Sequence, residues 1–562
     1  MSRLLLVCFV AGLVLAVWFG ALEYRELFHP DEGRYALIPY EMVTSGDWVT
    51  PRLNGLKYFE KPPLQYWLTA VSYLVLGADE WTARLWPALA GLLTVGLVFW
   101  AGRRLSGVRA GATAAALLAS TFQFFLFSQI LTLDMGLTFF LTLALVAFLA
   151  SQDADSRPAT RRGWALVMWA AMALAVLSKG LVGVVLPALV LSVYLLLERD
   201  WGLLRRLSWG AGVPLFLGIV LPWFVLVQVR NPGFSEFFFV REHLARYAMQ
   251  GHDRNGPWYY FLIVLVAGSL PWSLTYLKAL LAGWRSDTCN RLALNPCRLL
   301  TLWVVVITVF FSLSASKLPG YVLPVFPAVA LLAGCQLESG KVRIRRANLA
   351  GIAAAGLTLA VAAPFLSRLP GVPVEGIHSS TLIPWILASG LVLAAGAGLA
   401  TLAIHRRREV ALFAVTLGSL LSFQLLLVGS QSIAGRYSTE AIVEQAQEAQ
   451  GGFDPDAPFF SVGLYDQTLP LHIGRPVTLV CYEDELAMGI AEEPSRAISS
   501  IEEFRSRWHA LAQAYAILKP DRFLAETHAA TPMVVLAASP KAVIVARSQV
   551  ESSRRLPTKA TL

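Results

Sequence analysis

The sequence predicts a polytopic α-helical membrane protein of about thirteen transmembrane helices, followed by a C-terminal soluble α/β domain. Of its 562 residues, 56% are hydrophobic and only 15% are charged, whereas a soluble domain carries about 25% charged residues. Mean hydropathy is +0.58. A water-soluble core has no room for this much apolar side chain, so lipid must be the solvent for most of the chain.

Long apolar stretches define the expected helices, because about 20 apolar residues cross the hydrocarbon core of a bilayer. The stretch 63–77 is shorter and begins at a proline, so we expect an interfacial or re-entrant helix there. The first span lacks a clear cleavage site, which favours an uncleaved anchor over a signal peptide. The expected spans are 4–22, 81–102, 109–128, 134–151, 163–179, 180–198, 209–229, 258–280, 297–314, 320–338, 348–367, 381–404 and 410–430.

The distribution of basic residues predicts the orientation of these spans. Lysine and arginine gather in the loops that follow even-numbered spans, and such loops are normally cytoplasmic. We therefore expect a cytoplasmic N-terminus, with the long first loop (about 23–80) and residues 431–562 on the other side of the membrane. The clusters that set this orientation include Arg103-Arg104, Arg161-Arg162, Arg205-Arg206, Arg345-Arg346 and Arg406-Arg407-Arg408.

Residues 431–562 have the pattern of a soluble domain. Apparent helices at 436–450 and 499–516 accompany short apolar strands at 459–465, 476–482, 533–539 and 542–548. This alternation is typical of a small α/β fold. We therefore divide the chain into a membrane domain, 1–430, and a soluble domain, 431–562.

The composition also excludes several classes of partner. A net charge of +9 favours nucleic-acid binding in a soluble protein, but here most arginines lie in short loops between apolar spans. We therefore expect no nucleic-acid partner. The five cysteines form no CxxC pair and no cluster with histidine at metal-ligand spacing, so we expect neither a disulfide framework nor a zinc site.

Acidic and basic residues gather in the non-cytoplasmic loops, although the arginine distribution alone set the orientation. Charged groups near membrane depth are costly and are therefore functional candidates. Arginine and lysine bind phosphate oxygens, whereas carboxylates orient an acceptor or stabilise a positively charged sugar centre. The set suits a bound phosphate beside a reacting sugar. Because there is no nucleotide pool outside the cytoplasm, we expect the sugar donor to be linked to a membrane lipid. The segments are 28–36 (FHPDEGRYA), 58–64 (YFEKPPL), 131–135 (LTLDM), 178–180 (SKG), 241–247 (REHLARY), 252–254 (HDR) and 316–321 (SKLPGY).

Individual residues in these segments also have simpler interpretations. Asp31 and Asp134 stand where a side chain caps a helix, and Lys179 and Lys317 stand at span ends, where lysines extend to the membrane surface. The histidines of the 241–254 loop lack compact ligand spacing. A divalent metal at Glu60 and His243 therefore has little support, and we expect no required cofactor.

Together the motifs resemble those of GT-C glycosyltransferases, which carry an acidic pair in the first external loop. More narrowly, HPDEGRY at 29–35, YFEKPP at 58–63, Asp134 and SKLPGY at 316–321 resemble the aminoarabinose transferases that modify lipid A (ArnT type). The resemblance covers essentially the whole chain. The Asp-Glu pair alone is less specific, because protein O-mannosyltransferases share it.

This resemblance implies inverting transfer of 4-amino-4-deoxy-L-arabinose from undecaprenyl phosphate to a lipid A phosphate. The expected location is the periplasmic face of a Gram-negative inner membrane, where the modification gives resistance to polymyxin. It implies that Asp31 and Asp134 are the essential carboxylates. The donor phosphate and carrier lipid would be held by Lys61, Arg246, Arg34, Tyr321 and Lys317, and the cavity would be lined by Glu32, Tyr35, Tyr58 and Glu60.

Two other functions stay open from the sequence. One is a related GT-C transferase that uses another polyprenyl-phosphate sugar or a protein acceptor. The other is a transporter, but transporters place polar residues near the midplane and show repeat symmetry, whereas these residues lie at one interface. The expected partners are the lipid-linked donor, lipid A and membrane lipid, and we expect a monomer.

Overall fold

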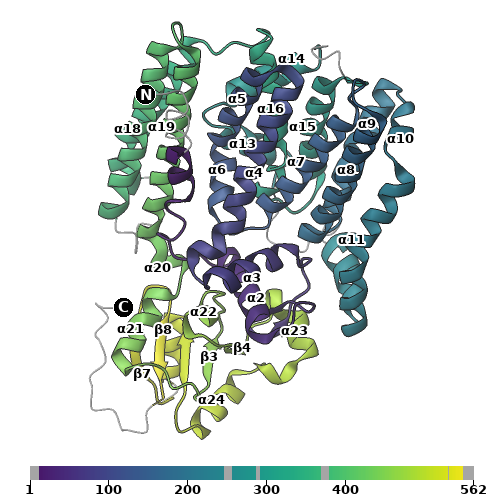
Figure 1. Ribbon diagram of the computed structural model, residues 1–562. Helices are drawn as coiled ribbons and strands as arrows, with labels where there is room; N and C mark the ends of the chain where they lie inside the picture. Colours follow the sequence, from purple (N-terminus) through teal and green to yellow (C-terminus); the bar gives the residue numbers. More distant parts are fainter. Residues whose placement is uncertain (1–11, 246–255, 287–291, 369–378, 529–530, 548–562) are drawn as a thin grey trace.

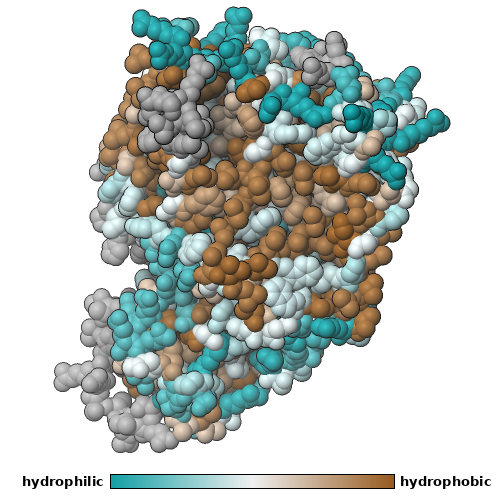
Figure 2. Space-filling view, viewed as in Figure 1, coloured by the Kyte–Doolittle hydropathy of each residue, from teal (hydrophilic) through white to brown (hydrophobic). Residues whose placement is uncertain are grey.

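The computed structural model describes residues 12–245, 256–286, 292–368, 379–528 and 531–547. A large helical bundle stands on a smaller α/β domain, and the first long loop lies between them (Figure 1). Figure 2 shows a broad hydrophobic band across the visible face of the bundle, with hydrophilic residues above it and over the smaller domain. This distribution is that of a multi-pass membrane protein.

Helices occupy every expected span from 81–102 onward, whereas 4–22 lies partly outside the described residues. By length and composition, eight described helices could cross a membrane, or ten if each bent pair is one span, against about thirteen expected. The bundle contains α4 (Glu80–Ser106), α5 (Val108–Ala119), α6 (Phe122–Gln129), α7 (Asp134–Ser151), α8 (Pro158–Lys179), α9 (Val182–Glu198), α10 (Gly202–Arg206), α11 (Trp209–Arg230), η1 (Glu236–Ala245), α13 (Tyr260–Gly268), α14 (Ser273–Gly283), α15 (Pro296–Leu313), η2 (Pro319–Val322), α16 (Val325–Glu338), α17 (Arg346–Ala362), η3 (Ala363–Arg368), α18 (Ser379–Ala403) and α19 (Arg408–Gly429).

Two of the expected spans are bent. The stretch 109–128 is bent by 65° between α5 and α6, and the stretch 258–280 is bent by 114° between α13 and α14. Pro271 lies in the second break, where a proline cannot continue the helical hydrogen bonding. The innermost helices are α7 and the η2–α16 segment, whose apolar windows are 83% and 94% buried.

The first long loop folds against the end of the bundle that faces the α/β domain, which we call the domain-side end (Figure 1). It forms α2 (Asp31–Ser45), a hairpin of β1 (Arg52–Leu53) and β2 (Leu56–Lys57), and α3 (Leu64–Leu76). Its 13 residues make α3 about 20 Å long, which is too short to cross about 30 Å of hydrocarbon. Its apolar Val75 is 73% exposed, which fits the interfacial helix expected over 63–77.

The C-terminal domain is built on one mixed sheet with strand order β5-β4-β3-β6-β8-β7. Strands β5, β4, β3 and β6 are parallel, and β8 and β7 add an antiparallel edge. Its elements are η4 (Ser430–Ile433), α20 (Ala434–Tyr437), α21 (Glu440–Gln450), β3 (Phe459–Val462), α22 (Leu469–Ile473), β4 (Thr478–Val480), η5 (Asp484–Leu486), α23 (Ala487–Glu492), η6 (Pro494–Arg496), β5 (Ala497–Ile498), α24 (Ile501–Ala510), β6 (Tyr515–Leu518), α25 (Pro520–His528), β7 (Val534–Ala538) and β8 (Val543–Ala546).

The expected helix over 499–516 is wrong at its end. Helix α24 stops at Ala510, and Tyr515–Leu518 forms β6, an inner strand that the sequence analysis missed. All four residues of β6 are buried. A strand that is buried on both faces reads as a continuous apolar run, which periodicity cannot separate from a buried helix.

The C-terminal domain docks directly on the first long loop. Leu53 and Leu56 of the hairpin share one buried hydrophobic cluster with Val477 and Leu486 of the domain. Asn54 exchanges two hydrogen bonds of 2.8 Å with the backbone of Val477. The loop and the domain therefore share one core.

A close backbone approach fixes the start of α2 on the domain. A Cβ atom at Gly33 would lie 2.8 Å from the backbone nitrogen of Thr468 and 2.9 Å from the carbonyl carbon of Gln467. Two ion pairs farther along the loop also join it to the domain, Arg52–Glu493 at 3.0 Å and Lys57–Glu492 at 2.7 Å. Only glycine permits this approach without displacing one backbone.

We predict that Gly33→Ala loosens the C-terminal domain, because overpacking a close contact costs about 1–3 kcal/mol. Limited proteolysis of the purified protein should cleave the domain faster than in the wild type. Gly96→Ala in α4 is the control, since a Cβ there meets nothing within 4 Å. Equal cleavage rates for the two variants would show that the Gly33 contact does not hold the domain.

Candidate active site

A cavity of about 190 Å³ lies at the domain-side end of the bundle. Its wall combines α2, the 60–61 segment, the beginning of α7, the end of α8 and the end of α15. Apolar side chains such as Leu137, Val182 and Phe310 line the part formed by the bundle. The charged residues of the wall are Asp31, Arg34, Glu60, Lys61, Asp134 and Lys179.

The ion pair between Asp134 and Lys179 joins two helix ends inside the cavity. The Lys179 ammonium lies 2.5 Å from Oδ1 of Asp134, and both side chains are about 15% exposed. The Asp134 carboxylate also rests against Gly320, where a Cβ would lie within 2.6–2.8 Å of its atoms. The Lys179 ammonium lies 5.4 Å from the ring centroid of Tyr321. Asp134 is thus held by contacts from two other elements, α8 and η2.

Arg34 connects the cavity to the C-terminal domain. Its Nη1 donates to Oδ1 of Asp31 at 3.2 Å, and its Nη2 forms an ion pair with Glu485. The Arg34 side chain is 9% exposed, whereas that of Asp31 is 52% exposed. Asp31 therefore presents a carboxylate to the open cavity while Arg34 is fixed in the wall.

The interpretation that Asp31 and Asp134 cap their helices is not supported by their contacts. The recorded partners of the two carboxylates are Arg34 and Lys179, and neither helix beginning has a side-chain capping hydrogen bond. Both residues stand at the first position of a helix, where the helix dipole favours a negative charge.

Glu60, Lys61 and Tyr35 complete the polar part of the wall. The Lys61 ammonium donates to the backbone carbonyl of Glu60 at 2.9 Å and lies 3.9 Å from its carboxylate. Burial raises the pKa of the Tyr35 phenol, so this side chain stays protonated and can donate a hydrogen bond to a ligand.

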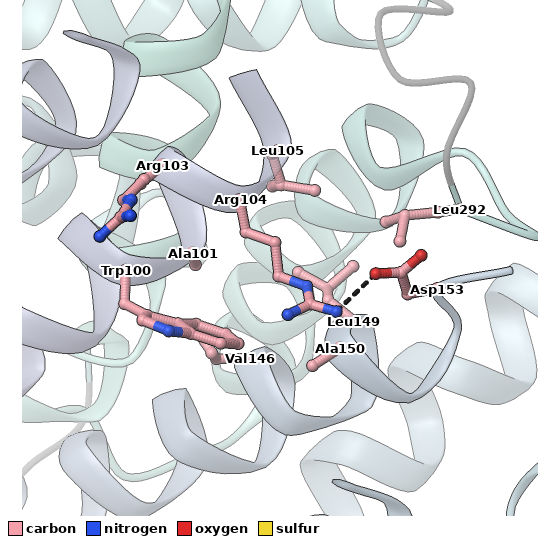
Figure 3. Close-up of a pocket in the computed structure, with 10 residues that line it drawn as sticks. All are labelled: Trp100, Ala101, Arg103, Arg104, Leu105, Val146, Leu149, Ala150, Asp153 and Leu292. Carbon is pink, nitrogen blue, oxygen red and sulfur yellow. Dashed lines mark hydrogen bonds and ion pairs between the residues drawn. The ribbon is translucent and has the colours of Figure 1, made fainter. Parts of the chain in front are cut away.

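A second cavity, of about 430 Å³, lies at the opposite end of the bundle, between the last turns of α4 and α7, and Figure 3 shows the residues that line it. There Arg104 donates to Asp153 and to Ser156 and lies over the ring of Trp100. None of the predicted site residues lines this cavity. The domain-side cavity is therefore the candidate active site.

Comparisons with known proteins identify the family of this chain. Residues 445–547 match the family model "Aminoarabinose transferase C-terminal domain", and residues 3–238 match the model "Dolichyl-phosphate-mannose-protein mannosyltransferase". The crystal structure of ArnT from Cupriavidus metallidurans bound to undecaprenyl phosphate is 38% identical, covers 97% of this chain and 98% of that chain, and superposes with a TM-score of 0.90. The chain belongs to the ArnT family.

Curated relatives carry the same family name. The undecaprenyl phosphate-alpha-4-amino-4-deoxy-L-arabinose arabinosyl transferase of Pseudomonas aeruginosa (strain UCBPP-PA14) is 37% identical over 338 residues, which cover 60% of each protein. The corresponding protein of Edwardsiella ictaluri (strain 93-146) is 31% identical over 66% of this chain and 67% of the relative. The chain thus aligns with about three fifths of the length of the Pseudomonas relatives.

The structure brings together most of the residues that the ArnT resemblance implied. The cavity wall contains Asp31, Arg34, Tyr35, Glu60, Lys61, Asp134 and Tyr321. Tyr58 is buried and does not line the cavity; burial raises its pKa, and its hydroxyl has no hydrogen-bond partner among the described residues. Lys317 is also outside the wall, because its ammonium donates to the carbonyls of Ser312 and Ser314.

Glu32 does not line the cavity, contrary to expectation. Its carboxylate points into the protein and forms ion pairs with Arg25 and with Arg84, the latter at 2.9 Å. Burial opposes ionisation, but the two guanidinium groups hold the pKa of Glu32 well below its usual range. Consecutive helical residues point in different directions, whereas Asp31 and Arg34, three residues apart, share one face.

The side chains of two expected site residues are not among those that the structure describes. Arg246 is outside the described residues, and His243 lies in η1 without a described side chain. Within the described parts of the chain, no group of three or more His, Cys, Asp or Glu residues is placed to hold a metal ion. The suggested metal at Glu60 and His243 stays a prediction.

Two residues of this site were given no role from the sequence. Lys179 stood in one of the candidate external segments, 178–180, but its pairing with Asp134 depends on the packing of α7 against α8. Glu485 lies more than 400 residues from Arg34 in the chain, in a domain where no catalytic motif marked it. For Lys179, the only sequence signal was a lysine in an external loop at the end of a span. For Glu485 there was no sequence signal.

We predict opposite outcomes for neutralising the neighbouring residues Asp31 and Glu32. Glu32→Gln leaves two buried guanidinium groups without their carboxylate, which costs about 3–5 kcal/mol. Asp31→Asn removes a half-exposed partner, which costs about 0–1 kcal/mol. Thermal unfolding of the purified proteins should show a clear loss of stability only for Glu32→Gln. A Glu32→Gln protein as stable as the wild type would contradict the structural role of this carboxylate.

Proposed function

We propose that the chain transfers 4-amino-4-deoxy-L-arabinose from undecaprenyl phosphate to phosphate groups of lipid A, with inversion at the anomeric carbon. The names of its curated relatives and its membership of the ArnT family support this reaction. The observation that carries the proposal is the charge of the cavity. Among the described residues, its wall holds three carboxylates (Asp31, Glu60, Asp134) and three cations (Arg34, Lys61, Lys179).

This balanced set suits a donor that carries both charges. An aminoarabinosyl phosphodiester has a negative phosphate and a positive ammonium only one sugar ring apart. Arg34 and Lys61 provide guanidinium and ammonium donors for the phosphate, and the half-exposed Asp31 provides a carboxylate for the amino group. The apolar residues Phe310 and Phe311 beside them suit the carrier lipid.

The proposed step is a single in-line displacement. An oxygen of the lipid A phosphate forms a bond to the anomeric carbon while the bond from that carbon to the donor phosphate oxygen breaks. The leaving undecaprenyl phosphate keeps the bonding electrons, and Arg34 and Lys61 stabilise its increased negative charge. The acceptor is already an anion, so it needs no general base. Asp31 and Asp134 therefore serve to orient the sugar for attack.

The proposed location is the inner membrane of a Gram-negative bacterium, with the cavity and the C-terminal domain in the periplasm. The basic clusters Arg103-Arg104, Arg161-Arg162 and Arg205-Arg206 favour a cytoplasmic position for the loops that carry them. Arg103 and Arg104 line the cavity at the end of the bundle away from the C-terminal domain (Figure 3). We further propose that lipid A is the acceptor and that the protein acts as a monomer.

Mass spectrometry of lipid A tests the function. The chain is expressed in polymyxin-sensitive Gram-negative cells that make the lipid-linked aminoarabinose but lack their own transferase. We expect lipid A to gain the mass of one aminopentose, and Asp31→Asn to abolish the gain while still accumulating in the membrane. Unmodified lipid A in cells that contain the wild-type protein would refute the proposal and favour another sugar or acceptor.

We predict that Gly320→Ala lowers the transfer rate by about 10²-fold, because a displacement of about 1 Å at a positioned group has that effect. The added Cβ would overlap the carboxylate of Asp134, which must move away from Lys179. Initial rates with purified protein and lipid-linked donor measure the effect. Gly398→Ala in α18, where a Cβ meets nothing within 4 Å, is the control. Equal rates for the two variants would remove the Gly320 contact from the mechanism.

A further inference from the structure

A carboxylate of the C-terminal domain lies directly behind the cavity. Glu485 belongs to η5 (Asp484–Leu486), and one of its oxygens forms an ion pair with Nη2 of Arg34. Both side chains are only 9% exposed. The other carboxylate oxygen accepts a hydrogen bond from the amide of Gln467. The soluble domain thus contributes a buried, oriented charge to the wall of a site in the membrane domain.

The two terminal nitrogens of the Arg34 guanidinium have different partners. Nη2 faces Glu485, and Nη1 donates to Asp31 at 3.2 Å across the cavity side of α2. A planar guanidinium that is bound at two of its nitrogen atoms has a fixed orientation. Without Glu485, the guanidinium would keep its ion pair with Asp31 but lose the contact that orients Nη2.

The segment that carries Gln467 is itself fixed to the sheet of the C-terminal domain. Asp466 accepts hydrogen bonds from the backbone nitrogen and the hydroxyl of Thr468, and its second oxygen pairs with Lys541. Lys541 immediately precedes the core of β8 (Val543–Ala546). Thr468 is also the residue that touches Gly33 at the start of α2. A continuous set of contacts therefore runs from the sheet to Arg34.

We propose that Glu485 is a positioning residue for Arg34, so that the C-terminal domain completes the donor-phosphate site. This inference rests on the proposed function, in which Arg34 binds the phosphate of undecaprenyl phosphate. Glu485 holds Nη2 of the guanidinium in the wall, so that Nη1 stays on the cavity side beside Asp31. From that position Nη1 can donate to the donor phosphate, while the half-exposed carboxylate of Asp31 accepts from the amino sugar.

The competing explanation is that Glu485 only helps to dock the domain. Glu493 provides a matched control, because it also pairs with an arginine of the first long loop, Arg52, at 3.0 Å. Neither Glu493 nor Arg52 lines the cavity. If the carboxylates serve only to dock the domain, Glu485→Gln and Glu493→Gln will have the same effect.

The test measures two quantities in full-length protein reconstituted in phospholipid nanodiscs. One is the Kd for undecaprenyl phosphate, and the other is the steady-state kcat and KM for the aminoarabinose donor. We expect Glu485→Gln to raise Kd and KM about tenfold while kcat changes less than threefold. Glu493→Gln should leave Kd, KM and kcat unchanged. Glu485→Asp keeps the charge and should recover part of the affinity, and it serves as the second variant if Glu485→Gln does not fold.

Wild-type values of Kd and KM in Glu485→Gln would overturn the inference, as would equal losses in Glu485→Gln and Glu493→Gln. Undecaprenyl phosphate binding requires neither the sugar nor the acceptor, so the two proposals fail separately. A Kd that depends on Glu485 in a protein that transfers no aminoarabinose would refute the reaction and keep the positioning role. Transfer with a Kd and a KM indifferent to Glu485 would refute only the positioning role.

Discussion

The buried carboxylate of Glu32 is the contact on which the geometry of the candidate site depends. It accepts hydrogen bonds from the side chains of Arg25 and Arg84 and from the backbone nitrogens of Phe28 and Leu131. These partners belong to the segment before α2, to α4 and to the segment before α7. A single acid therefore joins three parts of the chain, and its many donors offset the desolvation of a fully buried charge.

The same helix is held from the other side by the C-terminal domain. Gly33 meets the backbone at Thr468, and Arg34 meets Glu485, so three consecutive residues of α2 contact the bundle or the domain. Buried polar contacts of this kind define one arrangement more than they add stability. The remaining residue of this turn, Asp31, is the one left half-exposed to the cavity.

Local sequence motifs revealed some residues of the candidate site but not others. The acids of the HPDEGRY and LTLDM segments and the lysine of YFEKPP were recognisable because local motifs carry them and the arginine distribution placed them on one side of the membrane. The resemblance gave Asp31 and Glu32 different roles but placed both side chains in the cavity, because the direction of each side chain depends on where α2 begins. The pairing of Arg34 with Glu485 depends on the docking of two distant segments, which no local pattern encodes.

The bends in the helices were also only partly predictable from local sequence. Pro271 stands in the break between α13 and α14 and made that bend detectable in principle. The break between α5 and α6 has no proline. Ser120 and Thr121 there donate hydrogen bonds to the carbonyls of Ala116 and Leu117, but serine and threonine are also enriched where membrane helices pack together. These residues therefore do not by themselves predict a bend.

The two halves of the cavity differ in how rigidly they are built. Asp134 and Gly320 stand at the ends of the two innermost segments, α7 and η2–α16, so packing of the bundle fixes them. Asp31 and Arg34 stand on a helix outside the bundle, which is held by α3, by the Glu32 cluster and by the C-terminal domain. The separation of the two aspartates therefore depends in part on how that domain docks. A soluble domain with no catalytic motif thereby contributes to the geometry of a site at the end of the membrane domain, because it contacts the helix that carries Asp31 and Arg34.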